Sequence, residues 1–451
     1  MNSDISNAPL ATAASKVVNA CADELWVQLQ AREPYYRNRA GLLIDQLPTG
    51  SLEEAEKESA ASRQILGKLR SIDHAELSRS DQVTTKFLLH MAEEGKQVAT
   101  EWWDSFPVTP YMAIIGLRAH FQHVFLSFKF NGAVDFERYL SLLSDYENLV
   151  RNCTEKVCLM AERGWRISCP ALPGARKSIM GLRTAAPSAL RPSSDRLGYA
   201  SELPAGWIDR MEGLVKQIIT AFDQLNSVFD GEYERHAPLV VGMMHQPGGA
   251  EAYDRAIRRH LTESVDPVQL HETGKGEVAR ITDAMAQLRG AQGWSRSERE
   301  FHDVLLHSPR SYAQSPEEVR MRYQSYIDRM VPWLPKLFHK LPSAPYDIAR
   351  LAPEAEPGMT YGYYEAPAQA GDAGVYYYNG SDLDGRLQLT AASVILHELM
   401  PGHHFHISRQ VENAGLPIIR REVTELSVFN EGWAEYAASL GVEAGVYDDP
   451  Y

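Results

Sequence analysis

Apolar residues recur along most of the chain at the three- and four-residue spacing of an amphipathic helix. Ser51 and either Ser78 or Ser80 stand where such segments should begin, and Pro316 after Ser315 suits a first helical turn. The pattern predicts helices over residues 10–33, 53–72, 80–99, 134–163, 205–235, 249–262, 267–292 and 316–330. A mainly α protein is therefore expected.

Two stretches interrupt this helical pattern. Residues 187–204 are rich in Pro, Ser and Arg, which predicts a loop. Between residues 342 and 385 Gly, Pro and Tyr dominate, and Val375–Tyr378 is a short β-prone run. We therefore expect an N-terminal helical region over residues 1–190. Residues 205–451 are expected to form one continuous domain that contains a small β element.

Composition and charge narrow the class of protein. The 451 residues carry a net charge of −14, from 45 basic and 59 acidic side chains, which argues against nucleic-acid binding. No apolar run approaches the about 20 residues that a membrane span needs, and the N-terminal residues lack the pattern of a secretory signal. Four cysteines in a chain of this length do not suggest a disulfide framework. These features predict a cytoplasmic protein that does not contact membranes.

A histidine-rich segment follows a helix that is apolar nearly all round. His397 and Glu398 end this helix, and His403 and His404 follow Pro401 and Gly402. Zinc commonly binds two histidines one helical turn apart, with a glutamate beside the first as general base. Here proline occupies that second position, and it disfavours a straight helix. A kink could bring His403 to the place of the second ligand, with His404 as the alternative.

A second segment could supply the remaining ligand. Asn430 and Glu431 lie in a helical pattern over residues 419–440, and Glu435 follows Glu431 by one turn on the same face. We expect Glu431 to be the third zinc ligand and Glu398 to be the catalytic base. Glu435 could accept a hydrogen bond from a ligating imidazole, with Asn430 beside it.

These two segments carry a resemblance to a known family. His-Glu-x-x-Pro-Gly-His-His followed by Asn-Glu-Gly-Trp-Ala resembles the family called domain of unknown function 885, whose members look like zinc metallopeptidases of the neurolysin and carboxypeptidase Taq kind. The second segment is also similar to the one that supplies the glutamate ligand in zinc aminopeptidases. The resemblance is clear over residues 265–440, and the Gly-His of the carboxypeptidase motif favours His403 over His404.

The resemblance also implies a fold and a substrate-binding mode. It implies a zincin-like, neurolysin-like helical fold in which the edge strand of a small sheet pairs with a bound peptide. Tyr376, Tyr377, Tyr378 and Asn379 are expected at this edge. The residue that stabilises the oxyanion stays open among Tyr363, Tyr364 and Tyr378.

The expected function is zinc-dependent hydrolysis of peptide bonds, short peptides included. Alternatives are a metal-dependent hydrolase of a non-peptide amide or ester, and a non-catalytic binding protein that a metal stabilises. Related proteins continue well beyond the glutamate ligand, so a further C-terminal segment or a homodimer is expected to complete the cleft.

Overall fold

The computed structural model describes residues 12–110, 112–197, 203–353, 356, 360–367, 371–423 and 426–449. Its contacts divide the chain into two compact units, Met1–Ala256 and Ile257–Tyr451, here called the N-terminal and C-terminal units. The predicted division at residues 190–205 is therefore placed too early. Helices on both sides of that stretch pack against each other and share one core, so it is a connection inside the N-terminal unit.

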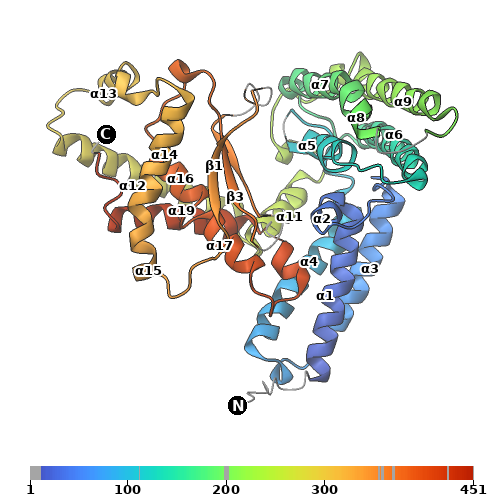
Figure 1. Cartoon of the computed structure of the whole chain (residues 1–451), viewed down its shortest axis with the longest axis horizontal. Helices are drawn as coiled ribbons and strands as arrows, with labels where there is room; N and C mark the ends of the chain where they lie inside the picture. The colour runs from blue at the N-terminus through green and yellow to red at the C-terminus, as the bar shows by residue number, and fades with distance from the viewer. Residues whose placement is uncertain are drawn as a thin grey trace. The chain divides into compact units, whose positions relative to one another are not determined.

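The N-terminal unit begins with helices that the hydrophobic pattern had predicted. Helices α1 (Ala13–Arg32), α3 (Leu52–Arg70) and α4 (Arg79–Glu101) pack alongside one another, and the short α2 (Pro34–Arg39) follows α1 (Figure 1). The side chains of Ser51 and Ser78 accept hydrogen bonds from the backbone amides of Glu54 and Asp81. These two serines are therefore the N-terminal caps of α3 and α4.

The larger core of this unit forms around α6 (Ala133–Glu162), which packs against α9 (Trp207–Val228). Aromatic side chains fill it, and the hydroxyl groups of Tyr139 and Tyr146 donate to backbone carbonyls of Leu190 and Leu117. The other elements are α5 (Met112–His120), a π-helical turn (Phe121–Leu126), α7 (Leu172–Leu190), α8 (Ser194–Leu197), α10 (Glu232–Arg235) and the start of α11 (Gly249–Leu261).

Two element boundaries differ from the sequence prediction. Pro187 lies inside α7, which continues to Leu190, so the predicted loop begins too early. The C-terminal pattern over residues 419–440 forms two helices, α18 (Ile418–Glu422) and α19 (Ser427–Glu443), where one was expected. A helical period shows which residues face the core, but it does not show whether the backbone runs on unbroken between them.

The C-terminal unit combines helices with a three-stranded sheet. Strands β1 (Tyr346–Arg350), β3 (Gly374–Tyr378) and β2 (Gly362–Glu365) lie in that order, with β1 parallel and β2 antiparallel to β3. Around the sheet and beyond it lie α12 (Pro267–Ala291), α13 (Glu298–Leu306), α14 (Pro316–Met330), α15 (Leu334–Leu337), α16 (Ala391–Glu398), α17 (His403–Val411), α18 and α19 (Figure 1).

The strand order corrects one expectation. The run that includes Tyr376 lies on β3, the central strand, whose backbone is paired on both sides. It therefore cannot be the edge that pairs with a peptide. A sequence pattern indicates a strand, but it does not indicate which neighbours will pair with it.

Helix α16 is the centre of the C-terminal core. It packs against α14 and α19, and Ile395 and Leu396 are fully buried. A Cβ on Gly441 of α19 would approach a side-chain carbon of Leu396 to 2.7 Å, so glycine lets these two helices lie close together. Their close contact is what brings residues of α16 and α19 into one site.

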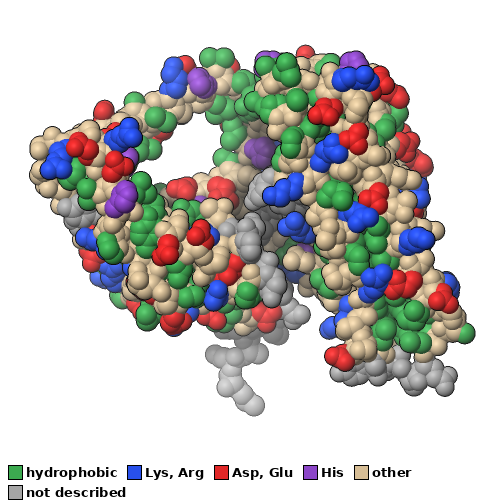
Figure 2. All heavy atoms as spheres, turned by 90° about the horizontal axis from the view of Figure 1, so that it is seen from above, with side chains coloured by type: hydrophobic (Ala, Val, Ile, Leu, Met, Phe, Trp, Pro, Cys, Tyr) green, Lys and Arg blue, Asp and Glu red, His purple; other side chains and the backbone are tan. Residues whose placement is uncertain are grey.

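Basic and acidic side chains are interspersed on the face shown in Figure 2. In the described part of the chain, no helix is both long and apolar enough to cross a membrane.

Candidate metal centre

A break between α16 and α17 shapes the candidate site. Helix α16 ends at Glu398, a cis peptide bond joins Met400 to Pro401, and α17 begins at His403. The indole N–H of Trp433 on α19 donates to the carbonyl of Pro401 over 3.0 Å, which ties the break to the neighbouring helix. The kink that proline and glycine predicted is thus a full interruption of the helix.

This interruption brings three of the predicted residues together. One donor atom each from His397, His403 and Glu431 lie within 4.8 Å of one another. The carboxylate of Glu431 spans the two imidazoles: one oxygen lies 3.3 Å from Nε2 of His397 and the other 3.8 Å from Nε2 of His403. Two helices and the start of a third therefore contribute to one cluster.

The donor set and spacing suit zinc. Tetrahedral zinc with bonds of about 2.0–2.1 Å to His nitrogen and carboxylate oxygen holds its ligand atoms about 3.3 Å apart. The separation of 3.3 Å between Nε2 of His397 and one Glu431 oxygen matches this spacing, and Nε2 of His403 lies 3.8 Å from the other Glu431 oxygen. The Glu431 side chain is 62% exposed, so the cluster is open towards solvent on the α19 side. An open side is typical of a catalytic site, because it leaves a position for water.

The electrostatics of His403 favour its neutral form. Burial first, and then the neighbouring His397, lower the pKa of His403 to about 4. A histidine must be neutral to bind a metal, so His403 is ready to do so without losing a proton.

Glu398 lies beside this cluster without an ion-pair partner among the described residues. Burial first, and then the charge of Glu431, raise the pKa of Glu398 to about 7. A carboxyl group with a pKa near neutrality can take up and release a proton with little cost, as a general acid–base residue must.

Glu435 contacts His397 at Nδ1, the ring nitrogen that does not face Glu431. Its carboxylate lies 3.1 Å from Nδ1 of His397, so it can accept the N–H that fixes this ring with Nε2 towards Glu431. Orienting carboxylates of this kind are common behind metal-binding histidines. Asn430, predicted beside it, lies on α19 directly before Glu431.

His404, the alternative ligand, lies outside the cluster. It is fully buried, its Nε2 lies 3.1 Å from the carbonyl of Ala344, and its Nδ1 lies 3.0 Å from the hydroxyl of Tyr364. Both ring nitrogens are thus engaged in joining α17 to the sheet. Its role in the structure is to position α17.

Several tyrosines predicted to bind substrate are structural. Tyr376 and Tyr378 are buried against Tyr323 of α14, and Tyr377 packs on Tyr363 across the sheet. Asn379 is also buried, and its amide donates to the carbonyl of Glu356. Of the three oxyanion candidates, Tyr364 alone stacks on His403, with ring centroids 6.4 Å apart.

Sequence reasoning did not single out two residues near the cluster. Trp433 lies in the Asn-Glu-Gly-Trp-Ala motif, but no sequence pattern predicted its hydrogen bond to the carbonyl of Pro401. His406 is buried, its ring lies 5.8 Å from that of His403, and neither of its nitrogens has a partner among the described residues. The spacing of three residues from His403 was the signal that could have drawn attention to it.

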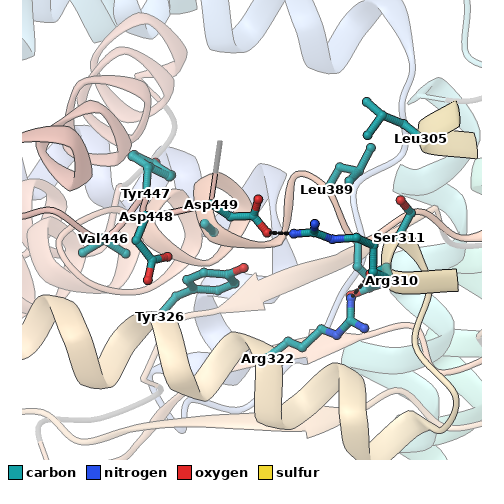
Figure 3. A pocket seen from close by; sticks show the side chains of 12 residues that line it. Leu305, Arg310, Ser311, Arg322, Tyr326, Leu389, Val446, Tyr447, Asp448 and Asp449 are labelled. Carbon is teal, nitrogen blue, oxygen red and sulfur yellow. Dashed lines mark hydrogen bonds and ion pairs between the residues drawn. The ribbon is translucent and has the colours of Figure 1, made fainter. Parts of the chain in front are cut away.

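The C-terminal unit also contains a small pocket, of about 100 Å³, which none of the predicted site residues line (Figure 3). Its two arginines are already paired: Arg310 with Asp449, and Arg322 with Glu318 at 2.7 Å and with the carbonyl of Arg310 at 3.1 Å. The predicted metal ligands and the predicted base all lie on α16, α17 and α19.

Comparison with known proteins identifies the family. The family described as bacterial protein of unknown function (DUF885) matches residues 34–451. The chain belongs to this family. No curated protein is significantly similar to it in sequence.

Two solved structures resemble this DUF885 chain in fold. One is a lipoprotein candidate from Colwellia psychrerythraea, with a TM-score of 0.78 and 22% identity, covering 98% of this chain and 80% of that one. The other is a lipoprotein candidate of unknown function from Shewanella oneidensis, with a TM-score of 0.67 and 14% identity, covering 98% and 79%. At these identities the likeness shows the fold alone.

Proposed function

We propose that this DUF885 protein is a zinc-dependent hydrolase of peptide bonds, with a zincin-like site held by His397, His403 and Glu431. One observation carries the proposal: the three donor atoms lie within 4.8 Å of one another, on the open side of the unit and beside a carboxyl group with a near-neutral pKa. Two imidazoles and one carboxylate are the ligand set of several zinc peptidases.

Each residue has a role in this proposal. Bound zinc would polarise the substrate carbonyl and lower the pKa of a bound water towards about 7. Glu398 takes the proton of that water and passes it to the leaving amine. Glu435 holds the ring of His397 in place. Tyr364 stacks on His403, but its O–H donates to Nδ1 of His404, so the proposal assigns no tyrosine as the donor to the oxyanion.

The same site offers a way to bind an extended peptide. Among the described residues, β2 pairs with β3 on one side, and no strand pairs with its other side. Tyr364 lies on β2 and connects this edge to the metal cluster through its contacts with His403 and His404. A peptide added alongside β2 would gain main-chain hydrogen bonds close to Glu398.

The test is hydrolysis of a peptide library by the zinc-loaded protein, with metal content measured by mass spectrometry. Glu398→Gln should retain zinc and lose about 100- to 10,000-fold in rate, because general acid–base catalysis contributes about that much. Glu443→Gln, exposed at the end of α19, is the matched control and should hydrolyse at the wild-type rate. Full activity of Glu398→Gln would show that the base is assigned wrongly.

The alternatives are separated by the same measurements. Zinc content without peptide hydrolysis, but with cleavage of amide or ester model substrates, would point to a non-peptide hydrolase. A chelator that unfolds the protein while no substrate is cleaved would point to a binding protein that the metal stabilises. Analytical ultracentrifugation tests the expected homodimer.

The cytoplasmic location expected from the sequence stays a prediction. The descriptions of the two fold relatives as lipoprotein candidates point away from the cytoplasm. Fractionation of cells that express the tagged protein distinguishes a soluble cytoplasmic pool from a membrane-associated one.

A further inference from the structure

The N-terminal unit contains a cavity that the proposed hydrolase does not use. Its volume is about 540 Å³, and helices α1, α3, α4, α5 and α6 line it. Sites for small molecules in proteins typically measure about 300–1,000 Å³ and combine apolar walls with a few polar groups. The size of this cavity therefore suits a ligand larger than a water cluster.

The wall of the cavity is largely apolar. Trp102, Leu117, Leu149 and Val98 contribute to it, and the indole N–H of Trp102 is already used in a hydrogen bond to the carbonyl of Gly50. Burial raises the pKa of Cys153, which also lines the cavity, to about 12, so its thiol is neutral. A ligand in contact with this wall must have an apolar body.

One cation in the lining lacks a carboxylate partner. Lys156 is 9% exposed, its Nζ donates to the hydroxyl of Ser105 over 3.2 Å, and it lies 5.1 Å from the centre of the Trp102 ring. No carboxylate of a described residue lies within 4.0 Å of this ammonium. Asp104, the acidic residue that acts on it electrostatically, is paired with Arg255. An ammonium has three N–H donors, so Lys156 can still bind an acceptor.

The acidic residues of the lining are already paired. Glu58 and Glu33 lie 2.9 and 3.8 Å from guanidinium nitrogens of Arg32. Glu54 accepts hydrogen bonds from the backbone amides of Thr49 and Gly50. They do not compete for Lys156, so its positive charge is available to a bound molecule.

His120 adds a second polar group. Its Nδ1 lies 2.8 Å from the carbonyl of Gly116, which requires a proton on Nδ1 and leaves Nε2 as an acceptor. This Nε2 is buried and has no partner among the described residues. A buried acceptor without a partner is uncommon and is often explained by a molecule that binds there.

We propose that this cavity is a binding site for a small amphipathic carboxylate, whose apolar body lies against Trp102 and Leu117 and whose carboxylate pairs with Lys156. A hydroxyl or amide N–H on the apolar body would satisfy Nε2 of His120. The inference concerns the N-terminal unit alone, and it does not depend on the hydrolase proposed for the C-terminal unit.

Isothermal titration of the whole protein with sodium decanoate, and with 1-decanol as its uncharged counterpart, tests the proposal. Wild-type protein should bind one decanoate per chain, at least about tenfold more tightly than decanol, because only the carboxylate adds an opposite charge to the hydrogen bond with Lys156. The comparison of the two ligands requires no variant, so it applies even if a variant does not fold. Absence of saturable decanoate binding, or equal affinities, would overturn the proposal.

Three variants locate the site. Lys156→Met should weaken decanoate binding at least about tenfold and leave decanol binding unchanged. Lys57→Met is the matched control, because Lys57 lines the same cavity but is exposed and paired with Glu53 at 2.6 Å. Its affinity for both ligands should equal that of the wild type. Ala61→Phe narrows the cavity and should weaken both ligands together. Wild-type binding of decanoate by Lys156→Met or by Ala61→Phe would place the ligand elsewhere and refute the assignment.

Discussion

Glu398 and Lys156 illustrate how burial prepares a single side chain for chemistry. Burial raises the pKa of Glu398 to about 7 and lowers that of Lys156 to about 8, so each side chain is shifted towards neutrality. Both border a candidate site. Perturbed pKa values cluster at functional sites because catalytic and binding groups need pKa values matched to their task.

The shift at Lys156 gives a prediction for the pH dependence of stability. Its folded pKa of about 8 lies below the unfolded value near 10.5, so between these values the unfolded chain binds more protons and stability rises with pH. The wild-type free energy of unfolding should therefore rise relative to Lys156→Met between about pH 8 and 10, by up to about 3 kcal/mol. Urea denaturation of both proteins at pH 7.5 and pH 10 measures this difference. A constant difference would show that Lys156 is not buried as described.

At the scale of elements, the helices were predictable and their interruptions were less so. Apolar spacing and serine caps located α1, α3, α4 and α6 to within a few residues, because these features are local. Pro401 and Gly402 also predicted a break after α16, because both residues disfavour a helix locally. The prediction that His397, His403 and Glu431 come together combined this break with the helical pattern that contains Glu431.

The remaining features depend on contacts between distant segments. The sequence pattern indicated β3, and the family resemblance implied that it lay at the edge of the sheet. Strand order is set by β1 and β2, which pair with it from elsewhere in the chain, so a local pattern could not show it. His404 could not be separated from His403 by spacing alone. The structure separates them, because the carbonyl of Ala344, 60 residues away, engages His404.

The helix break can be tested with two glycines that differ in their surroundings. A Cβ on Gly402 would lie 1.7 Å from the carbonyl oxygen of His397, whereas one on Gly432 of α19 meets nothing within 4 Å. Gly402→Ala should therefore destabilise the protein by at least about 2 kcal/mol and reduce its zinc content. Gly432→Ala, adjacent to Glu431, should retain zinc and gain up to about 1 kcal/mol, since alanine favours a helix interior. Thermal unfolding and metal analysis report both. Normal zinc content in Gly402→Ala would mean that the break does not position the ligands.

At the scale of the whole molecule, the two candidate sites lie in separate units. The candidate metal centre is built entirely from the C-terminal unit, and the cavity around Lys156 entirely from the N-terminal one. The fold extends over both, since the two solved relatives each cover 98% of the chain. A fold shared at 22% and 14% identity indicates the architecture alone. The activity must therefore be inferred from the residues of the two candidate sites.

Hydrogen exchange followed by mass spectrometry can distinguish the two sites in one protein. A ligand that binds the folded state suppresses local opening where it makes contacts, and so slows amide exchange there. Zinc should protect peptides from α16, α17 and α19, and decanoate should protect peptides from α3, α4 and α6. Glu431→Gln should remove the effect of zinc and keep that of decanoate, while Lys156→Met should do the reverse. Protection by zinc that survives in Glu431→Gln would exclude Glu431 as a ligand, because the carboxylate oxygens that span His397 and His403 would then be dispensable for binding.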